Sequence, residues 1–159
     1  MPWSLIVSAA CVIIVAVVGA RLTVLGPWYA GLRKPAWKPP DAAFGAIWTV
    51  VFILLVTAFT LAWERSDDPS VRLGIALTFA INCLLNIGWN ILFFRMRRPD
   101  LALIEVVIFW FSIVAMMWAF GQSGLLPALL LIPYLAWVTA ASFLNRAIVV
   151  MNPRSDASA

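Results

Sequence analysis

The amino-acid sequence predicts an all-α integral membrane protein, a bundle of five transmembrane helices. Of its 159 residues, 64% are apolar and 11% are charged, and the mean hydropathy is +1.00. Soluble domains carry about 25% charged residues, so this composition excludes an ordinary soluble surface. In addition, five apolar stretches are each long enough, at about 20 residues, to cross a hydrocarbon core of about 30 Å. They run approximately over residues 5–25, 44–63, 71–94, 101–120 and 125–149.

These spans are expected to form a single domain, 1–152, followed by a polar tail, 153–159. The first span is expected to be retained, because no Lys or Arg precedes it and it exceeds the roughly 7–15 residues of a signal-peptide core. Asp68 and Asp100 are expected to cap the helices that follow them. Turn residues and prolines separate the spans at 26–27, 67–70, 97–100 and 121–124.

The basic residues predict the orientation. With five spans, the first and third loops lie on the same side as the C-terminus, and only Arg65 and Arg72 lie on the other side. The positive-inside rule therefore predicts an outer N-terminus and an inner C-terminus, and favours the bacterial cytoplasmic membrane. The net charge of +4 reflects this topology and gives no reason to expect a nucleic-acid partner. The cations on the inner side are Arg21, Arg33, Lys34, Lys38, Arg95, Arg97, Arg98, Arg146 and Arg154.

The first loop, 26–43, contains the least membrane-like stretch, "WYAGLRKPAWKPP". Its prolines at 35, 39 and 40 fix φ and remove backbone donors, so we expect a stiff, extended or turn-like cover and not a helix. Two interpretations remain open. The loop is either an interfacial aromatic belt whose cations touch lipid phosphates, or the lid of a pocket. The residues concerned are Trp28, Tyr29 and Trp37 with Arg33, Lys34 and Lys38.

Three spans each carry a polar or aromatic stripe at helical spacing. Amides in hydrocarbon need partners, so the asparagines are expected to face protein or a polar cavity. A single stripe is typical of helix packing with Asn as the hydrogen-bonding residue, but three stripes in five helices favour an aromatic-lined pocket. The stripes are Trp48, Phe52, Leu55 and Phe59; Asn82, Asn86, Trp89 and Phe93; and Tyr134, Trp137, Ala141 and Asn145.

In the fourth span, Glu105 is the one acid well inside an apolar stretch. We expect it either to pair with Arg21 or to snorkel toward the interface. The chain has no His, and Cys11 and Cys83 lack the CxxC spacing of a metal or redox site. We therefore expect no metal site.

An aromatic pocket under a basic lid would suit a large, flat, apolar ligand with carboxylates. Indole and phenyl rings stack on its π-face, and the lid cations Arg33, Lys34 and Lys38 pair with its carboxylates. A tetrapyrrole with propionates, such as a porphyrin or haem, fits this description, and no covalent cofactor is expected.

Short motifs run in order through nearly the whole chain. They are Trp28–Tyr29, Leu32, Lys34–Pro35, Trp37 and Pro39–Pro40; Trp48–Thr49; "LNIGWNILFF" with Asn86, Trp89, Phe93 and Phe94; Trp110; and "PYLAW" with Pro133, Tyr134 and Trp137, then Leu144 and Asn145. In these motifs the sequence resembles the TspO/MBR family, the bacterial tryptophan-rich sensory proteins and the mitochondrial translocator proteins, also called peripheral benzodiazepine receptors.

The resemblance implies a five-helix bundle, commonly a homodimer, whose first loop caps a pocket for porphyrins and haem-type tetrapyrroles. It implies that Trp48 and Trp137 are pocket tryptophans linked to light-dependent porphyrin breakdown, that Asn86, Trp89 and Trp110 belong to the site, and that the size of Ala141 affects affinity. The sequence departs from the family at Phe52, where tyrosine is common. The stretch "RAIVVMN" after Asn145 lacks the tyrosine of the mitochondrial sterol motif, so sterol binding is not expected.

Three functions are compatible with these observations. The first is a receptor or sensor for tetrapyrroles that acts in tetrapyrrole homeostasis or stress signalling. The second is an enzyme that degrades porphyrin with light and oxygen, in which Trp48 and Trp137 are the catalytic residues and the ligand supplies the photochemistry. The third is a tetrapyrrole transporter, which the absence of an inverted repeat disfavours. For a homodimer, the sequence itself offers only the small-residue pair Ala76 and Ala80.

Overall fold

The computed structural model describes residues 3–153 of the chain and is all-α over them. Five of its helical segments are long and apolar enough to cross a membrane, which confirms the predicted spans. The elements are α1 (Trp3–Leu22), α2 (Pro27–Gly31), α3 (Asp41–Glu64), α4 (Pro69–Asn90), the π-helix η1 (Ile91–Arg95), α5 (Pro99–Gly121), α6 (Leu125–Leu129) and α7 (Ile132–Met151).

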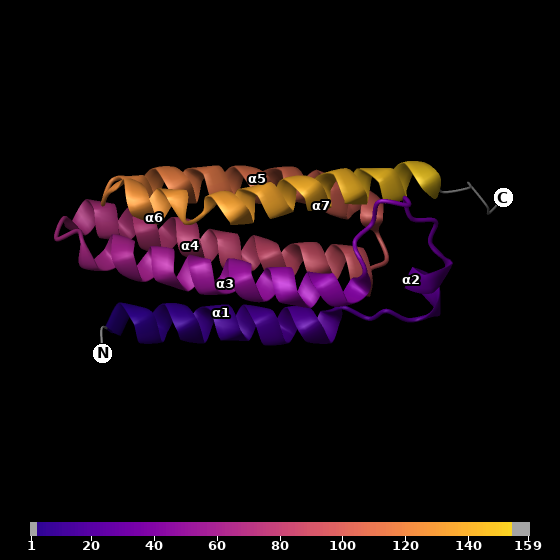
Figure 1. The fold of residues 1–159 in the computed structure, drawn as a ribbon, viewed down its shortest axis with the longest axis horizontal. Coiled ribbons are helices and arrows are strands. Elements are labelled where there is room, and N and C mark those ends of the chain that lie inside the picture. Colours follow the sequence, from indigo (N-terminus) through magenta and orange to yellow (C-terminus); the bar gives the residue numbers. More distant parts are fainter. Residues whose placement is uncertain (1–2, 154–159) are drawn as a thin grey trace.

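The long helices lie side by side in one elongated bundle (Figure 1). Helix α5 packs between α4 and α7, and α1 packs against α3 and α4. Figure 1 shows α1 along one edge of the bundle and the lid, with α2, at the end opposite the N-terminus. The lid therefore covers the end where α1 and η1 finish and α3 begins.

The interior of the bundle holds large apolar side chains, among them Ile75, Ile113, Met116 and Phe120, none of which is exposed to solvent. Large apolar side chains such as Leu84 also point outward, at 69% exposure. In lipid this outer surface is favourable, and the helices satisfy their backbone groups internally. Packing inside the bundle and contact with hydrocarbon outside thus explain why these sequences form helices.

The fifth span contains a break that the sequence analysis did not predict. Helix α6 ends at Leu129 and α7 begins at Ile132. Pro133 has no backbone N–H to donate to the carbonyl four residues earlier, so a continuous α-helix cannot pass through this position unbent. The chain bends there, and α7 continues to Met151.

The expectation that the lid contains no helix was wrong. Residues Pro27–Gly31 form the short helix α2. Pro27 stands in the first helical turn, where its fixed φ is already helical and its missing N–H is not needed. The prolines at 35, 39 and 40 follow this helix, and the chain around them is non-helical up to α3.

The third span ends in a π-helix. The backbone N–H of Met96 donates to Ile91 O at 2.8 Å and that of Arg98 to Leu92 O at 2.9 Å. Arg97, between them, has a φ of 55°, in the left-handed region that usually holds glycine at a helix end. This turn sets the positions of Phe93, Phe94 and the arginines that follow.

The capping predictions have mixed outcomes. Asp68 caps α4 as expected, accepting a hydrogen bond from Ser70 N at 2.8 Å. Asp100 is not the N-cap residue of α5, because it lies within the first turn of that helix, where it pairs with Arg98 at 2.7 Å. The predicted tail, 153–159, lies outside the described residues from 154 onward, as does Arg154.

Candidate ligand-binding site

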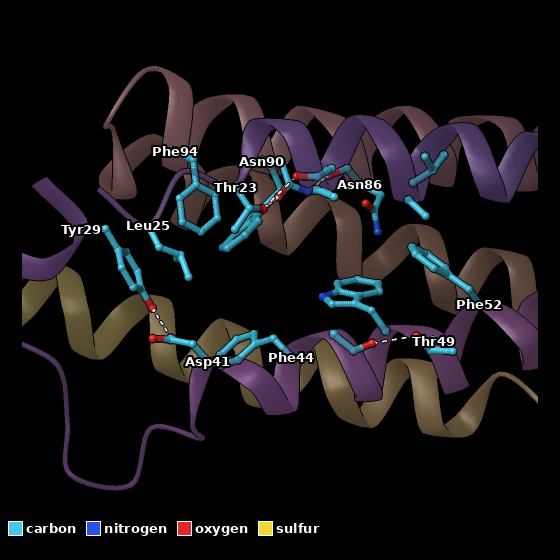
Figure 2. Close-up of a pocket in the computed structure, with 17 residues that line it drawn as sticks. Thr23, Leu25, Tyr29, Asp41, Phe44, Thr49, Phe52, Asn86, Asn90 and Phe94 are labelled. Atoms are coloured by element: carbon cyan, nitrogen blue, oxygen red, sulfur yellow. Dashed lines mark hydrogen bonds between the residues drawn. The ribbon is translucent and has the colours of Figure 1, made fainter. Parts of the chain in front are cut away.

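A cavity of about 510 Å³ lies between α1, α3 and α4, beneath the lid (Figure 2). Its volume falls within the roughly 300–1,000 Å³ of small-molecule sites. In Figure 2 the side chains of Phe52, Asn86, Phe94, Tyr29 and Phe44 surround its open centre. The wall consists of Val15, Ala16, Gly19, Ala20, Thr23, Leu25, Tyr29, Asp41, Phe44, Gly45, Trp48, Thr49, Phe52, Asn86, Trp89, Asn90 and Phe94.

The three helices contribute different chemistry to this wall. Helix α1 contributes small side chains, which leave the space open. Helices α3 and α4 contribute aromatic rings, and α4 also contributes the amides of Asn86 and Asn90. Trp48 and Phe52 lie against each other, with ring centroids 5.1 Å apart. The cavity is thus a largely aromatic chamber with a few polar groups, which is the usual composition of a small-molecule site.

Five of the residues predicted to bind ligand line this cavity: Tyr29, Trp48, Phe52, Asn86 and Trp89. Asn86 is also buried, at 4% exposure. The stripes on the second and third spans therefore face a common space between α3 and α4. The stripe on the fifth span does not reach it.

At the lid, the Tyr29 hydroxyl donates to Asp41 Oδ1 at 3.3 Å, and Lys38 Nζ pairs with the same oxygen at 2.5 Å. Burial, reinforced by Asp41, raises the pKa of Tyr29 to about 12. The phenol therefore stays protonated at neutral pH and acts as a hydrogen-bond donor at the wall of the cavity. Because both donors meet on Asp41, the lid and the start of α3 are held together here.

Three residues of the predicted site serve instead as connections between helices. Tyr134 donates to Asn82 Oδ1 at 2.9 Å. Asn145 accepts from Trp89 Nε1 at 3.2 Å, and Trp110 donates to Thr139 Oγ1 at 2.8 Å. None of Tyr134, Asn145 and Trp110 lies in the cavity wall. The polar atoms of these residues are used to join α4, α5 and α7.

The other aromatic residues of the predicted site surround the cavity at a distance. Phe93 is buried and stacks on Trp89, with ring centroids 4.9 Å apart, and Trp28 packs against Phe93 at 6.1 Å. Trp137 packs behind the cavity residue Phe44, at 5.3 Å. Trp37 is 56% exposed and lies outside the wall.

Ala141, on α7, also lies outside the wall. The difference between Trp48 and Trp137 matters most for function, because only Trp48 faces the cavity. Both had been expected to touch the ligand.

The lid cations are engaged within the lid itself. Lys34 Nζ donates to the backbone carbonyls of Tyr29 and Leu32 and stands 4.3 Å from the centre of the Tyr29 ring. Arg33 is exposed, and its backbone bonds to Asn152 at the end of α7. Of the three, Lys38 is the one that forms an ion pair with an acidic residue of the cavity wall, Asp41.

Several wall residues were not predicted. No role was predicted for α1, although small residues recur at helical spacing along it and at its end, a signal that could have been used. They are Ala16, Gly19, Ala20 and Thr23. Asn90 follows Asn86 by one turn and donates to Asn86 O at 2.9 Å. Phe94 stands in the motif that carried the resemblance but was not named as a ligand contact.

Glu105 does not pair with Arg21, contrary to one of the two expectations. Its two carboxyl oxygens are buried and have no hydrogen-bond partner within residues 3–153. One of them would lie 3.7 Å from a Cβ placed on Gly88. The side chain is therefore turned toward α4.

Comparison with known proteins agrees with this architecture. The sequence model of the TspO/MBR family matches residues 7–151. The chain is 41% identical, over 130 residues, to the tryptophan-rich protein TspO of Chlorobaculum tepidum, an alignment that covers 79% of this chain and 80% of that protein. It is 35% identical over 122 residues to the translocator protein of Sus scrofa, covering 74% of this chain and 70% of that protein.

It is also 31% identical over 129 residues to protein CrtK of Rhodobacter capsulatus, covering 80% of each. The match to the family model reaches all five spans and includes the residues of the cavity wall. The resemblance inferred from the motifs is confirmed, and the chain is an integral membrane protein of the TspO/MBR family.

Proposed function

We propose that this protein is a membrane receptor for porphyrin or haem-type tetrapyrroles, which it binds in the cavity between α1, α3 and α4. Such a receptor acts in tetrapyrrole homeostasis or stress signalling. The observation that carries the proposal is the cavity itself, about 510 Å³ in volume, whose wall includes the rings of Tyr29, Phe44, Trp48, Phe52, Trp89 and Phe94.

The chemistry of the wall suits a flat, conjugated ligand. Aromatic faces stack on such a ring system and exclude lipid. The amides of Asn86 and Asn90 provide polar groups near the middle of the chamber. They supply donors and acceptors for a ring nitrogen or a ring substituent, which fixes the orientation of the ligand.

A ligand carboxylate is best received at the lid. Lys38 already pairs with Asp41, and Asp41 lines the cavity. A propionate entering here competes with Asp41 for the ammonium group of Lys38. The contact that it forms with this group is a charge-assisted hydrogen bond. We propose that Lys38, rather than Arg33 or Lys34, holds the carboxylate.

The test is a titration of the purified full chain with protoporphyrin IX in the dark, followed by porphyrin absorbance and tryptophan quenching. Trp48→Phe is expected to weaken binding by about 3- to 10-fold, because it removes part of a stacked aromatic contact. Trp137→Phe is the matched control: it makes the same change outside the wall, so its affinity should stay within about twofold of wild type.

A second variant tests the cavity by filling it. Gly19→Leu inserts a side chain into the wall formed by α1 and should abolish saturable binding. Its far-UV circular dichroism and elution from a sizing column should match wild type. If both Trp48→Phe and Gly19→Leu bind like wild type, the cavity is not the tetrapyrrole site.

A light-driven degradation of the bound porphyrin is the second candidate, favoured by the position of Trp48 in the wall. The same titration repeated under light and oxygen examines it. Loss of porphyrin absorbance that follows the bound fraction and is suppressed by Trp48→Phe would support this activity. Bleaching at the same rate without protein would exclude it.

We further propose that the lid end faces the cytoplasm of a bacterium and that the protein forms homodimers. All described cations except Arg65 and Arg72 lie at this end, where the positive-inside rule places the cytoplasm. For the dimer, Ala76 is partly buried and Ala80 is exposed on α4, a small-residue pair that permits close helix contact in lipid. Cross-linking in membranes of single-cysteine variants at position 80, made without Cys11 and Cys83, tests this contact.

A further inference from the structure

A second cavity, of about 340 Å³, lies on the other side of Phe94 from the aromatic chamber. It is bounded by the end of α1, the start of the lid and the turn after η1. Phe94 lines both cavities and separates them. The second cavity has a different chemistry, because its wall includes three arginines: Arg21, Arg95 and Arg97.

Within residues 3–153, no acidic side chain neutralises the positive charge of this wall. No acid of that range lines the cavity, and the ion pairs of that range are Lys38–Asp41, Arg72–Asp67 and Arg98–Asp100. Nearby Arg98 is thus paired, whereas the three arginines of the wall are not. Arg21, Arg95 and Arg97 are exposed, so water screens part of their mutual repulsion, and an anion bound between them would reduce it further.

The backbone at Arg97 supports a role for its side chain. Its φ of 55° places it in the left-handed conformation at the end of η1. A residue other than glycine is strained in that conformation, and glycine is the usual occupant of this helix-ending position. The chain carries an arginine there, and this residue belongs to the wall of the cavity.

The remaining wall is apolar and belongs to the boundary of a membrane span. Leu22 is the last residue of α1, Val24 is 62% exposed, and Trp28 is an aromatic residue of the lid. Earlier in α1, the side chains of Ile13, Ile14 and Val17 point outward and are 49–61% exposed. An acyl chain can therefore follow α1 outward from a headgroup held in the cavity.

We propose that this cavity binds the headgroup of an anionic phospholipid, with the phosphate held by Arg21, Arg95 and Arg97. Guanidinium groups bind phosphate oxygens in pairs of charge-assisted hydrogen bonds. A soluble phosphate would satisfy the same groups, but the apolar wall and the position at the end of a span select a lipid. The site is independent of the tetrapyrrole proposal, since its residues other than Phe94 are not in the wall of the first cavity.

The test uses the purified full chain in detergent and three probes: dioctanoyl phosphatidylglycerol, dioctanoyl phosphatidylcholine and inorganic phosphate. Binding is followed by tryptophan fluorescence and by the rise of Tm at saturating probe. We expect saturable binding of phosphatidylglycerol, binding of phosphatidylcholine about tenfold weaker, and an affinity for phosphatidylglycerol that falls with added salt.

Two variants locate the site. The double variant Arg21→Gln, Arg95→Gln should weaken phosphatidylglycerol binding by about 30-fold, since each basic residue contributes about fivefold near an anionic headgroup. The matched control, Arg33→Gln with Arg146→Gln, removes the same charge from exposed arginines at the same end of the bundle and should change binding by less than about threefold.

Arg97→Gly separates binding from folding. Glycine adopts the left-handed conformation without strain, so the Tm of this variant without lipid should equal or exceed that of wild type. Its affinity for phosphatidylglycerol should nevertheless fall about fivefold. Wild-type affinity in both the double variant and Arg97→Gly would overturn the site. Equal affinity for inorganic phosphate and phosphatidylglycerol would overturn its assignment to a lipid.

Discussion

At the scale of single residues, the buried amides show how polar groups are used inside an apolar bundle. Asn145, on α7, accepts from Trp89 of α4 and donates to Pro99 O of α5 at 2.9 Å. Asn82, on α4, donates to Ser112 of α5 at 2.9 Å and accepts from Tyr134 of α7. Each amide thus joins three helices, which is stabilising in a medium that offers no competing water.

Tyr134→Phe tests this arrangement. The change leaves Asn82 Oδ1 without its donor and removes the acceptor that Asn86 Nδ2 contacts at 3.5 Å. An unsatisfied buried group costs about 1–3 kcal/mol in water-soluble proteins and interhelical hydrogen bonds contribute about 0.6 kcal/mol on average in membranes, so we expect a loss of about 1 kcal/mol. Thermal unfolding in detergent measures it.

Ser142→Ala on the same helix serves as the control. The Ser142 hydroxyl donates at 2.7 Å to Val138 O within α7, so its loss breaks no contact between helices. If the two variants unfold at the same temperature, the Tyr134 hydroxyl does not stabilise the bundle.

The sequence was sufficient to place the asparagines inside, because an amide exposed to hydrocarbon is too costly. Asn82, Asn86 and Asn145 are all at 4% exposure or less. It was not sufficient to separate cavity residues from packing residues. Trp48 and Trp137 both follow inward-facing stripes, and only the position of α1, which opens a space beside α3 and α4, decides that Trp48 faces it.

At the scale of elements, local chemistry explains some helix ends and tertiary packing explains others. The start of α4 was predictable, since Asp68 is followed by Ser70 at the spacing of an N-terminal cap. The π-helix η1 was not predictable, because the hydrophobic periodicity of an apolar stretch does not reveal a turn that contains one extra residue.

The cap at Asp68 predicts a pH dependence. The hydroxyl and backbone N–H of Ser70 hold the pKa of Asp68 below its ordinary value. Because the pKa is lower in the folded state, the stabilisation is present above the unfolded pKa of about 3.9 and is lost as the pH falls through the folded value. Asp68→Asn keeps the acceptor oxygen but does not titrate.

The Tm of wild type minus that of Asp68→Asn should therefore decrease between about pH 6 and about pH 3. A difference that stays constant over this range would show that the cap does not depend on the charge. Asp68→Ala should have the lowest Tm of the three at pH 6, since it removes the acceptor altogether.

At the scale of the whole molecule, the lid is tied to the far end of the chain. Asn152, just after α7, accepts from Arg33 N at 2.9 Å and donates to Arg33 O at 2.9 Å. This pair joins residues 119 positions apart. Together with the Tyr29–Asp41 and Lys38–Asp41 contacts, it holds the lid over the cavity from two sides.

Asn152→Ala should loosen the lid. Loss of two hydrogen bonds of about 0.5–1.5 kcal/mol each shifts the opening equilibrium by about tenfold. Amide hydrogen exchange over residues 28–40, measured by mass spectrometry, should accelerate to that extent, while exchange in α5 stays unchanged.

Asn152→Asp keeps the oxygen that accepts from Arg33 and removes the donor, so its exchange should be intermediate. Exchange at the wild-type rate in Asn152→Ala would mean that Asn152 does not control the lid.

The small side chains of α1 have a consequence for engineering. Ala16, Gly19 and Ala20 keep the chamber hollow, and a Cβ at Gly19 would come no closer than 3.7 Å to Asn90. Larger residues here would gain packing contacts, so they would raise heat resistance while removing the space for a ligand. A mutant library selected only for survival of heating should therefore accumulate substitutions at these three positions. Selection for thermostability alone would in this way produce a sturdier protein that has lost its chamber.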